Sequence, residues 1–571
     1  MDSCFVQDIY PNNALYAVTI RSPVAKGRLK SIDCPILPDN YFFIKASDIP
    51  GKNQIEGTDL PILTGDNLSY IGEPMALLLG PDKTWLEEYS MQCRITLEEE
   101  EPLISFLEAP EEMVLARRDI KIGDPEEAYS RAIKTIQSEY WTGMQEHCYP
   151  EPVGAVSWYE DGLLVVKTAT QWPKHVERSI AGVLDIAPSS LSVRPTLLDP
   201  DMDNKLWYPS LIACHASLGT FITKNPVRLI LNREEEFLFS PKRPETLISI
   251  SSALDDNGNI IGTEIDASVN LGAFGVNTEE FLDQIFIGSL GMYNFGSIKF
   301  YAKAIRTNIP PAGSFSGFGL SQGFFAHERH VCEIVEEIKQ DPVEWRKSHI
   351  NKTGNIGFNP KNGEELISAA ASMADYYRKW ASYELIKKNR TRFTWSENSE
   401  GFRGIGIALG CQENGKLKAS SFPKPGCAAS VVEITIDPIE YIPKIRGVWL
   451  CIDGGKILNE NHARTVLNIT AAQAIGWSFE EEIHYSQGML SHDDFENYTI
   501  PVPGDIPPIC IDFLNSDSEE SKGIGDLPFN CIPAAFLQAV SQAMDRHFCS
   551  IPIKRSEILE AKQLVKTEKT V

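Results

Sequence analysis

The sequence lacks the marks of several large classes of protein. No two of its twelve cysteines stand in a C-x-x-C arrangement, which excludes zinc ribbons and iron–sulfur clusters held within this chain. The first ten residues carry no basic region followed by an apolar run, and no stretch of 18 consecutive apolar residues occurs anywhere. We therefore expect a cytoplasmic protein with reduced thiols and no membrane segment.

Positive charge is scarce as well. The 53 lysines and arginines are outnumbered by 78 aspartates and glutamates, which gives a formal net charge of −25. A surface with this excess repels phosphate backbones and offers no basic footprint for DNA or RNA. We expect no nucleic-acid partner.

What the chain does have is the length and composition of a folded protein with several domains. Its 571 residues are 43% hydrophobic and 23% charged, and a domain takes about 100 to 200 residues. Apolar periodicity predicts an α+β protein with one unit over residues 1–110, a linker around 110–124, a second unit over 125–352 and a third over 363–571.

The expected elements follow from that periodicity and from turn signals. The pair Asn257-Gly258 predicts a hairpin, because it accepts the positive φ values of a tight turn. The glycines of residues 404–410 have the wrong spacing for a dinucleotide loop and lie in a strand pattern. We predict strands at 15–20, 41–44, 75–79, 93–97, 163–168, 227–231, 247–253, 260–269, 405–409, 430–436 and 447–452, and helices at 85–91, 174–184, 364–388, 463–476 and 534–547.

Residues 311–322, reading PAGSFSGFGLSQ, place three glycines within seven residues just before a predicted helix that stops before Pro342. Glycine permits a ligand to lie against the backbone, and the start of a helix offers unpaired N–H groups to an anion. A tight turn between strand and helix is the alternative. His327 and His330 on that helix lack a third ligand, so we interpret them as a structural or surface pair rather than a metal site.

Several motifs, taken in order, resemble one family. The chain is similar to the molybdopterin-binding subunit of xanthine dehydrogenases and aldehyde oxidases, which implies a hammerhead domain followed by two molybdenum-cofactor-binding α+β domains, the last abbreviated. The motifs that carry the resemblance are RSP at 21–23, ASDIP at 46–50, YIG at 70–72, QEHCYPEP at 145–152, ATQ at 169–171, REEE at 233–236, SFSGFGLSQ at 314–322, DGG at 453–455, LN at 458–459, AQAIG at 472–476 and KGIGDLP at 522–528.

The resemblance implies hydroxylation of a purine, an N-heterocycle or an aldehyde with oxygen derived from water. It implies molybdenum–molybdopterin as cofactor, with 2Fe-2S and FAD on separate partner subunits. The residue roles that it implies are Asp526 as catalytic base and Gln171 near the metal, Gly317, Gly319 and Gln473 close to the cofactor, Gly523 and Gly525 carrying the base on a tight turn, and Phe315, Ser316 and Phe318 along the substrate channel.

The chain departs from the family's pattern in four places. An acidic stretch at 199–205 stands where the family has glycines, and proline and carboxylates obstruct an anionic cofactor there. Ser316 replaces an arginine that would orient the substrate. Asp526 replaces a glutamate and is shorter by about 1.5 Å. A block is skipped between Leu417 and Ala428.

Because of these departures, two alternatives to an active enzyme remain open. One is a catalytically inactive homologue that acts as a scaffold without molybdenum. The other is a subunit that binds a small organic ligand in the same cleft.

Overall fold

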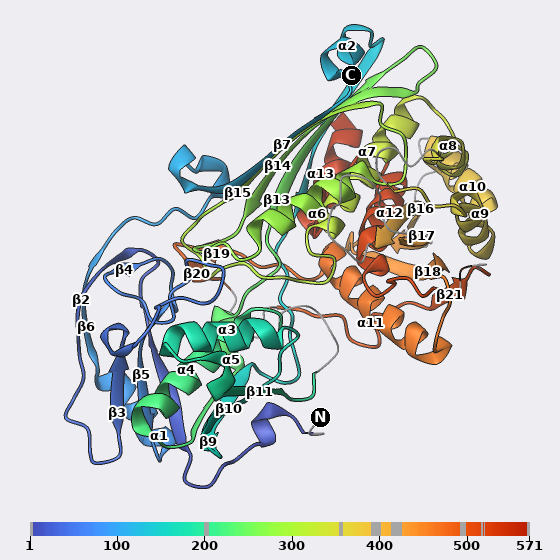
Figure 1. Ribbon diagram of the computed structural model, residues 1–571. Helices are drawn as coiled ribbons and strands as arrows, with labels where there is room; N and C mark the ends of the chain where they lie inside the picture. Colours follow the sequence, from blue (N-terminus) through green and yellow to red (C-terminus); the bar gives the residue numbers. More distant parts are fainter. Residues whose placement is uncertain are drawn as a thin grey trace.

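The chain is built on two large sheets and one four-stranded sheet, each packed against helices (Figure 1). The computed structural model describes residues 4–198, 205–352, 358–389, 401–412, 425–491, 498–515, 518 and 520–567. This mixture of helix and sheet confirms the predicted α+β class.

The N-terminal part of the chain contributes to a seven-stranded sheet. Its order is β11-β10-β9-β12-β1-β5-β3, and β1 pairs in parallel with β12, Leu15 opposite Val227. The first predicted unit therefore shares a sheet with residues 154–230, and a division at residue 110 stays a prediction. The strands are β1 (Leu15–Arg21), β3 (Phe42–Lys45), β5 (Pro74–Gly80), β9 (Gly154–Glu160), β10 (Leu163–Thr168), β11 (Leu191–Pro195) and β12 (Val227–Ile230).

Helices and a small second sheet surround these strands (Figure 1). Asp82 caps α1 by accepting hydrogen bonds from the N–H groups of Thr84 and Trp85. The helices are α1 (Lys83–Gln92), α3 (Pro173–Leu184), α4 (Tyr208–Thr223) and α5 (Arg233–Phe239); the small sheet has β4 (Asn67–Leu68), β2 (Gly27–Asp33) and β6 (Arg94–Glu99).

A six-stranded sheet of order β22-β8-β13-β14-β15-β7 forms the middle of the molecule. The predicted hairpin joins β13 and β14, where Gly258 has φ +79°. Helices α6 and α7 lie side by side against the sheet (Figure 1). The elements are β7 (Val114–Ile122), α2 (Pro125–Ser130), β8 (Lys134–Thr142), β13 (Thr246–Leu254), β14 (Ile260–Asn270), α6 (Thr278–Leu290), β15 (Ser297–Ile305), α7 (Leu320–Glu337), α8 (Pro342–His349) and β22 (Ser550–Ile551).

The linker predicted around residues 110–124 is wrong. Most of it is β7, which pairs antiparallel with β15, Ile120 opposite Phe300. Its side chains alternate between partly buried and exposed from Ala116 to Ile122, as in a strand with one covered face. Arg117, Arg118 and Lys121 concealed that alternation, because long basic side chains make the segment read as polar.

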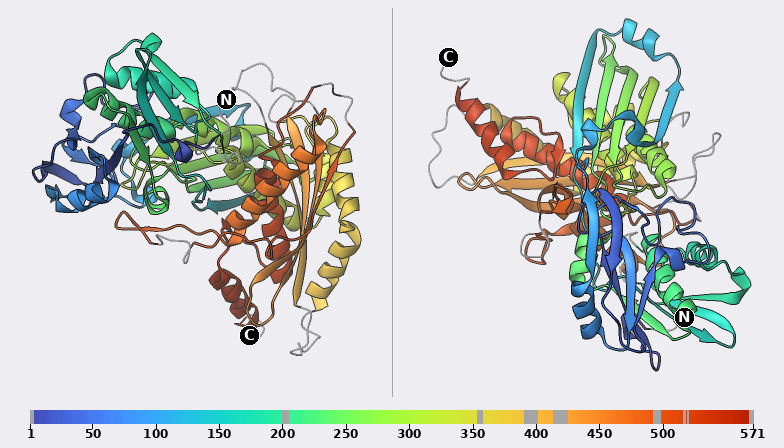
Figure 2. Two further views of the ribbon diagram at one scale, coloured as in Figure 1. Left: turned by 90° about the horizontal axis from the view of Figure 1, so that it is seen from below. Right: turned by 90° about the vertical axis from the view of Figure 1, so that its left-hand side faces the viewer.

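The C-terminal part holds a four-stranded sheet of order β16-β17-β18-β21. Figure 2 (left) shows the yellow helices α9 and α10 on one face of it and α11 and α12 on the other. The elements are α9 (Gly363–Met373), α10 (Tyr376–Asn389), β16 (Phe402–Gln412), β17 (Gly426–Ile436), β18 (Pro443–Asp453), α11 (Glu460–Phe479), β19 (Tyr485–Ser486), β20 (Met489–Leu490), β21 (Ile509–Phe513), α12 (Leu527–Met544) and α13 (Arg555–Thr567).

Glycines in β16 allow α12 to lie directly on the strand. A Cβ on Gly404 would lie 1.9 Å from the carbonyl oxygen of Ala539, and one on Gly406 2.1 Å from that of Ala535. The glycines of residues 404–410 thus serve packing within a strand, which confirms that they form no dinucleotide loop.

For two of the predicted helices, the bounds in the structure differ clearly from the predicted bounds. The single helix expected at 364–388 is two helices, α9 and α10, because Asp375 has a left-handed backbone with φ +51°. Helix α12 begins seven residues before the predicted start at Ala534, since Pro528 at its beginning and Pro533 inside it disguised its first turns. No helix of the described residues is both long enough and apolar enough to cross a lipid bilayer.

Candidate functional site

Eight of the ten predicted site residues lie in the two segments that lead into α7 and α12. The loop before α7 packs on the first turn of α12 through Phe315, whose ring centroid lies 5.8 Å from that of Phe529. The first turn of α7 contacts the same turn, because Ser321 Oγ donates to Asn530 Oδ1 at 2.6 Å. Gly317 and Gly319 have φ +87° and +84°. A Cβ on Gly317 would lie 1.7 Å from Ser321 Oγ, so the turn needs glycine for its own packing.

The same segment contains a G-x-S-x-G spacing, Gly319 to Gly323, that is typical of hydrolase nucleophiles. Ser321 is fully buried, and its hydroxyl is engaged by Asn530, whose Nδ2 donates to the carbonyl of Cys411 at 2.9 Å. The hydroxyl therefore supports the contact between α7 and α12 and has no exposed face from which to attack a substrate.

The two predicted channel phenylalanines pack in different surroundings. Phe315 is 2% exposed and stacks on His147, with 4.3 Å between the ring centroids. Phe318, with φ +27°, meets Phe281 of α6 edge to face at 5.3 Å. The substrate channel between them stays a prediction.

A buried arginine that the motif analysis did not assign stands at the centre of the cluster. The guanidinium carbon of Arg243 lies 4.2 Å from the ring centroids of Phe315 and Trp477 and 4.7 Å from that of Phe529. Its Nη2 donates to the carbonyl oxygen of Ser316 at 3.0 Å. A permanent cation thus reaches the loop from another element.

Gln145 connects this arginine to α11. Its Oε1 accepts a hydrogen bond from Arg243 Nε at 3.1 Å, and its Nε2 donates to the carbonyl of Gln473 at 3.1 Å. Nearby, Tyr498 donates to the buried carboxyl of Glu481. Burial raises the pKa of Glu481 to about 8, so this carboxyl is largely protonated at neutral pH.

Gln171 lies between β10 of the seven-stranded sheet and α3. Its backbone N–H donates to the carbonyl of Lys205 at 2.8 Å. The Lys205 ammonium lies 3.0 Å from Glu151 Oε2 and 4.8 Å from the ring centroid of Tyr149. Tyr149 in turn stacks on His147, at 5.7 Å between centroids. A chain of contacts therefore runs from Gln171 to the ring that Phe315 covers.

His147 was quoted within a motif but given no role. Its Nε2 donates to the carbonyl of Ser314 at 2.8 Å, and burial, with the nearby cations Lys242 and Arg243, holds its pKa well below the usual value. Lys242 itself pairs with the buried Glu146 at 2.5 Å. The imidazole is therefore neutral and fixes the backbone just before the loop.

Asp526 is the residue before the first turn of α12, and Gln412 at the end of β16 holds it. Gln412 Nε2 donates to Asp526 Oδ2 at 3.1 Å, and the Asp526 N–H donates to Gln412 Oε1 at 2.8 Å. The preceding residues are anchored by an ion pair of 2.9 Å between Lys522 and Asp453. The predicted base is thus held by a second side chain on a well-supported segment.

The two glycines before Asp526 differ in their surroundings. The carbonyl of Gly523 lies 1.9 Å from where a Cβ on Gly426 would stand, whereas a Cβ on Gly525 would have Val466 as its nearest neighbour, at 3.8 Å. Gly523 is therefore packed against β17, and the segment opens at Gly525. Their predicted part in carrying the base stays untested.

Gln322 is a residue that the sequence interpretation missed. Its side chain is fully buried, and neither its Nε2 nor its Oε1 has a hydrogen-bond partner among the described residues. A buried amide without partners is costly, so it marks a place where a polar ligand would be bound. The signal in the sequence is a glutamine among apolar residues at the start of α7.

Two of the four departures from the family pattern lie largely outside the described residues. They are the acidic stretch 199–204 and the skipped block as far as residue 424. The structure describes Lys205, Ser316, Asp526 and the chain from Pro425 onward.

The histidine pair of α7 belongs to the core. His330 contacts Tyr140 Oη at 3.0 Å and Ser252 Oγ at 2.9 Å through its two ring nitrogens. His327 bonds the carbonyl of Ser289 at 2.9 Å. Burial lowers the pKa of both, to about 4 for His330 and about 3 for His327, which keeps them neutral.

One group of possible metal-ligating atoms lies elsewhere, on Glu333, His547 and Cys549, within 4.8 Å of one another. Glu333 pairs with His547, and Arg329 Nη2 lies 3.2 Å from both nitrogens of that ring. A guanidinium at this distance opposes a metal cation, so we interpret the group as an ion-pair cluster.

Two family models match the chain. One, described as a molybdopterin cofactor-binding domain, matches residues 106–350, and the other, with the same description, matches residues 411–507.

Relatives and a solved structure agree with these matches. Aldehyde oxidase 2 of Macaca fascicularis is 25% identical over 403 residues, which cover 68% of this chain and 30% of that protein. The nicotinate dehydrogenase large molybdopterin subunit of Eubacterium barkeri is 25% identical over 365 residues, covering 61% of this chain and 85% of the relative. The aldehyde oxidoreductase of Desulfovibrio gigas shares the fold, with a TM-score of 0.85 at 18% identity over 98% of this chain and 78% of that one.

Proposed function

The chain belongs to the xanthine dehydrogenase and aldehyde oxidase family, as its two molybdopterin cofactor-binding domains and its relatives require, and on that premise we propose that it is the molybdopterin-binding subunit of an oxidoreductase. Its reaction would be hydroxylation of a purine, another N-heterocycle or an aldehyde with oxygen derived from water. The proposal places it in the cytoplasm, as its cysteine usage predicts.

One observation carries this proposal. Gln412 of β16 holds the carboxylate of Asp526 just before α12. The first turn of α12 contacts Phe315 of the glycine loop and Ser321 of α7. A base positioned by a second group, next to a loop that would border the substrate, is the arrangement that general-base catalysis needs.

Amide side chains near the start of α7 and in α11 would suit the hydrogen-bonding groups of the cofactor. A pterin offers hydrogen-bond donors and acceptors along one edge, and an amide side chain can serve both. Gln322 has a buried amide whose two polar atoms find no partner in the described parts of the chain. Together with Gln171 and Gln473, it would hold the pterin. When bound, molybdenum–molybdopterin would supply the redox chemistry.

The chain's own residues would position the reactants and move a proton. Asp526 Oδ1 would take a proton from the attacking oxygen, while the Gln412 amide keeps Oδ2 in place at 3.1 Å. The start of α12 stabilises negative charge on this carboxylate. Arg243 would hold the loop at Ser316 and exclude water by its three ring contacts.

Electrons would leave through other subunits. The chain has no C-x-x-C arrangement for a cluster, and its relative in Eubacterium barkeri is named as a large subunit. We therefore propose separate 2Fe-2S and FAD subunits as partners.

Metal analysis tests the proposal. Protein co-expressed with its partner subunits in a host that makes molybdopterin should contain about one molybdenum per chain. Asp526→Asn should keep the metal and lose about 10²- to 10⁴-fold in kcat. Asp512→Asn, on an exposed residue of β21, is the matched control and should keep full activity. If the chain contains no molybdenum even when its partner subunits are present, the proposal that it belongs to a molybdenum enzyme is wrong.

A second function has its own support. Ser316 presents no charged side chain, and Arg243 is enclosed by three rings at 4.2–4.7 Å rather than turned toward a ligand. These features favour a catalytically inactive homologue that serves as a scaffold or binds a small organic ligand without molybdenum. Co-purification of partner subunits with metal-free chain would support the scaffold.

A further inference from the structure

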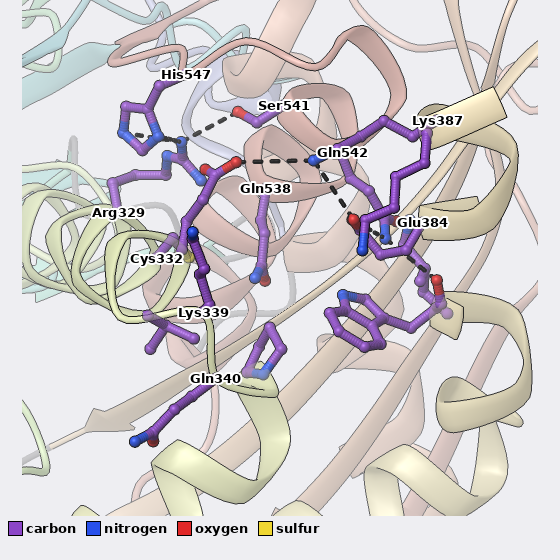
Figure 3. Close-up of a pocket in the computed structure, with 16 residues that line it drawn as sticks. Arg329, Cys332, Lys339, Gln340, Glu384, Lys387, Gln538, Ser541, Gln542 and His547 are labelled. Carbon is purple, nitrogen blue, oxygen red and sulfur yellow. Dashed lines mark hydrogen bonds and ion pairs between the residues drawn. The ribbon is translucent and has the colours of Figure 1, made fainter. Parts of the chain in front are cut away.

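A cavity lies between the later turns of α7 and α12, facing α10 (Figure 3). Its volume is about 440 Å³, within the range of small-molecule sites, about 300–1,000 Å³. The lining glutamine Gln538 follows Asn530 of the proposed catalytic cluster by eight residues along α12, which is a rise of about 12 Å. This cavity is therefore separate from the proposed molybdopterin site.

Arg329, which is fully buried, is one of the residues that line the cavity. Its Nε and Nη2 donate to the carbonyl of Phe548 at 3.2 and 2.9 Å, and Nη2 also donates to Ser541 Oγ at 3.1 Å. Nη1 has no hydrogen-bond partner among the described residues. A buried guanidinium nitrogen without a hydrogen-bond partner is energetically costly, and a ligand that offers an acceptor atom would relieve that cost.

A second donor stands beside it. Gln538 accepts the Ile407 N–H on its Oε1 at 2.7 Å, which fixes the orientation of the amide. Its NH₂ group makes no hydrogen bond with the described part of the chain. Figure 3 shows the Gln538 side chain reaching into the space between the residues of α7 and those of α10.

The carboxylates of the lining are already paired. Lys387 lies 3.7 Å from Glu336 Oε1, 3.5 Å from Glu384 Oε2 and 3.1 Å from Asp545 Oδ1. Gln542 Nε2 donates to Glu384 Oε1 at 3.0 Å. The two carboxylates of the lining therefore pair with Lys387, and the charged groups left for a ligand are cationic.

The remaining walls are apolar or cationic. Trp380, Val335, Pro342 and Ile405 provide apolar surface, of which the indole is the largest part. Lys339 and Lys388 stand at the lining without an ion-pair partner among the described residues. Such a combination suits an anion that carries a flat or branched hydrocarbon body.

We propose that this cavity is a binding site for an aromatic carboxylate. The carboxylate would accept hydrogen bonds from Arg329 Nη1 and the Gln538 NH₂ group, and the ring system would lie against Trp380. Lys339 at the opening would attract the charge of the ligand.

Calorimetric titration of the full chain with 2-naphthoate and with 2-naphthamide tests this site. The two probes have the same rings, and only the naphthoate is charged. We expect one naphthoate per chain, bound at least tenfold more tightly than the amide. Absence of saturable binding up to about 1 mM naphthoate, or equal affinity for the two probes, would overturn the proposal.

Three variants locate the bound probe. Trp380→Ala should lower the affinity for both probes at least tenfold. Lys339→Glu should lower the affinity for naphthoate at least fivefold and leave the affinity for naphthamide unchanged. Lys444→Glu, an exposed lysine of β18, is the matched charge control and should change neither. Naphthoate binding that survives Trp380→Ala and Lys339→Glu would place the probe elsewhere and refute the site. Trp380 is partly buried and Lys339 is exposed, so both variants should retain the fold more readily than a change at the fully buried Arg329.

Discussion

Arg243 Nη2 donates to the carbonyl oxygen of Ser316 at 3.0 Å, across 73 residues of sequence. The family that the chain resembles has an arginine where this chain has Ser316, and here Arg243 brings a cation to the backbone of that residue from another element. The charge supports the loop from within, where three aromatic rings surround it.

Arg243→Leu should therefore destabilise the chain. Desolvated cation–π contacts contribute about 2 kcal/mol, and hydrogen bonds from a charged group about 1.5–3 kcal/mol. We expect a loss of about 3 kcal/mol, which lowers Tm by about 6–12 °C for a domain of 150–250 residues. Arg546→Leu, which removes an exposed arginine 6.0 Å from the Phe548 ring, should change Tm little. Equal thermal shifts in the two variants would contradict a structural role for Arg243.

Gln412→Leu tests how Asp526 is positioned. The substitution keeps the size of the side chain but removes both hydrogen bonds to Asp526, at 2.8 and 3.1 Å. A misplaced catalytic group costs about a hundredfold in rate for about 1 Å. We expect kcat to fall by about 10- to 100-fold while the molybdenum content and KM stay the same. An unchanged kcat would mean that Gln412 does not position the base.

Glu481 predicts a pH dependence of stability. Burial raises its pKa from 4.5 to about 8, so the folded chain keeps a proton that the unfolded chain releases. Its contribution to stability is therefore fully present below pH 4.5 and is lost as the pH rises toward 8. Glu481→Gln remains neutral, so Tm of the variant relative to the parent should rise between pH 5 and pH 8. A difference in Tm that does not change with pH would contradict the raised pKa.

The ion pair of Glu328 and Arg346 predicts a second stability effect. Both side chains are fully buried, Arg346 Nη2 lies 2.8 Å from Glu328 Oε2, and Tyr293 donates to Oε1 at 2.8 Å. Arg346→Met leaves a buried carboxylate without its cation and should cost about 3–5 kcal/mol in denaturant unfolding. Adding Glu328→Gln should recover part of that loss.

The exposed pair of Lys299 and Glu264 serves as control. Lys299→Met should change stability by less than about 0.5 kcal/mol, because a solvated pair contributes little. If Arg346→Met lowers the free energy of unfolding by no more than Lys299→Met does, the buried pair does not stabilise the fold.

The sequence alone predicted the elements whose pattern is local. The strand at 163–168, the helix at 174–184 and the hairpin at Gly258 follow from period and turn chemistry, and the structure confirms them, with the helix beginning one residue earlier, at Pro173. Helix α4 was missed because thirteen of its sixteen residues are buried, so it has no polar face to mark its period. Likewise, β7 was read as a linker because its basic residues hide the alternation.

The sequence by itself determined the family and the order of its motifs, since these depend on residue identities that can be read along the chain. Only the tertiary structure decided that Arg243 is enclosed by Phe315, Trp477 and Phe529, and that Gln412 holds Asp526. It also showed that the amide of Gln322 is buried without a partner in the described residues. These relationships join positions up to hundreds of residues apart, and local patterns carry no information about such contacts, because folding brings them together through packing of whole elements.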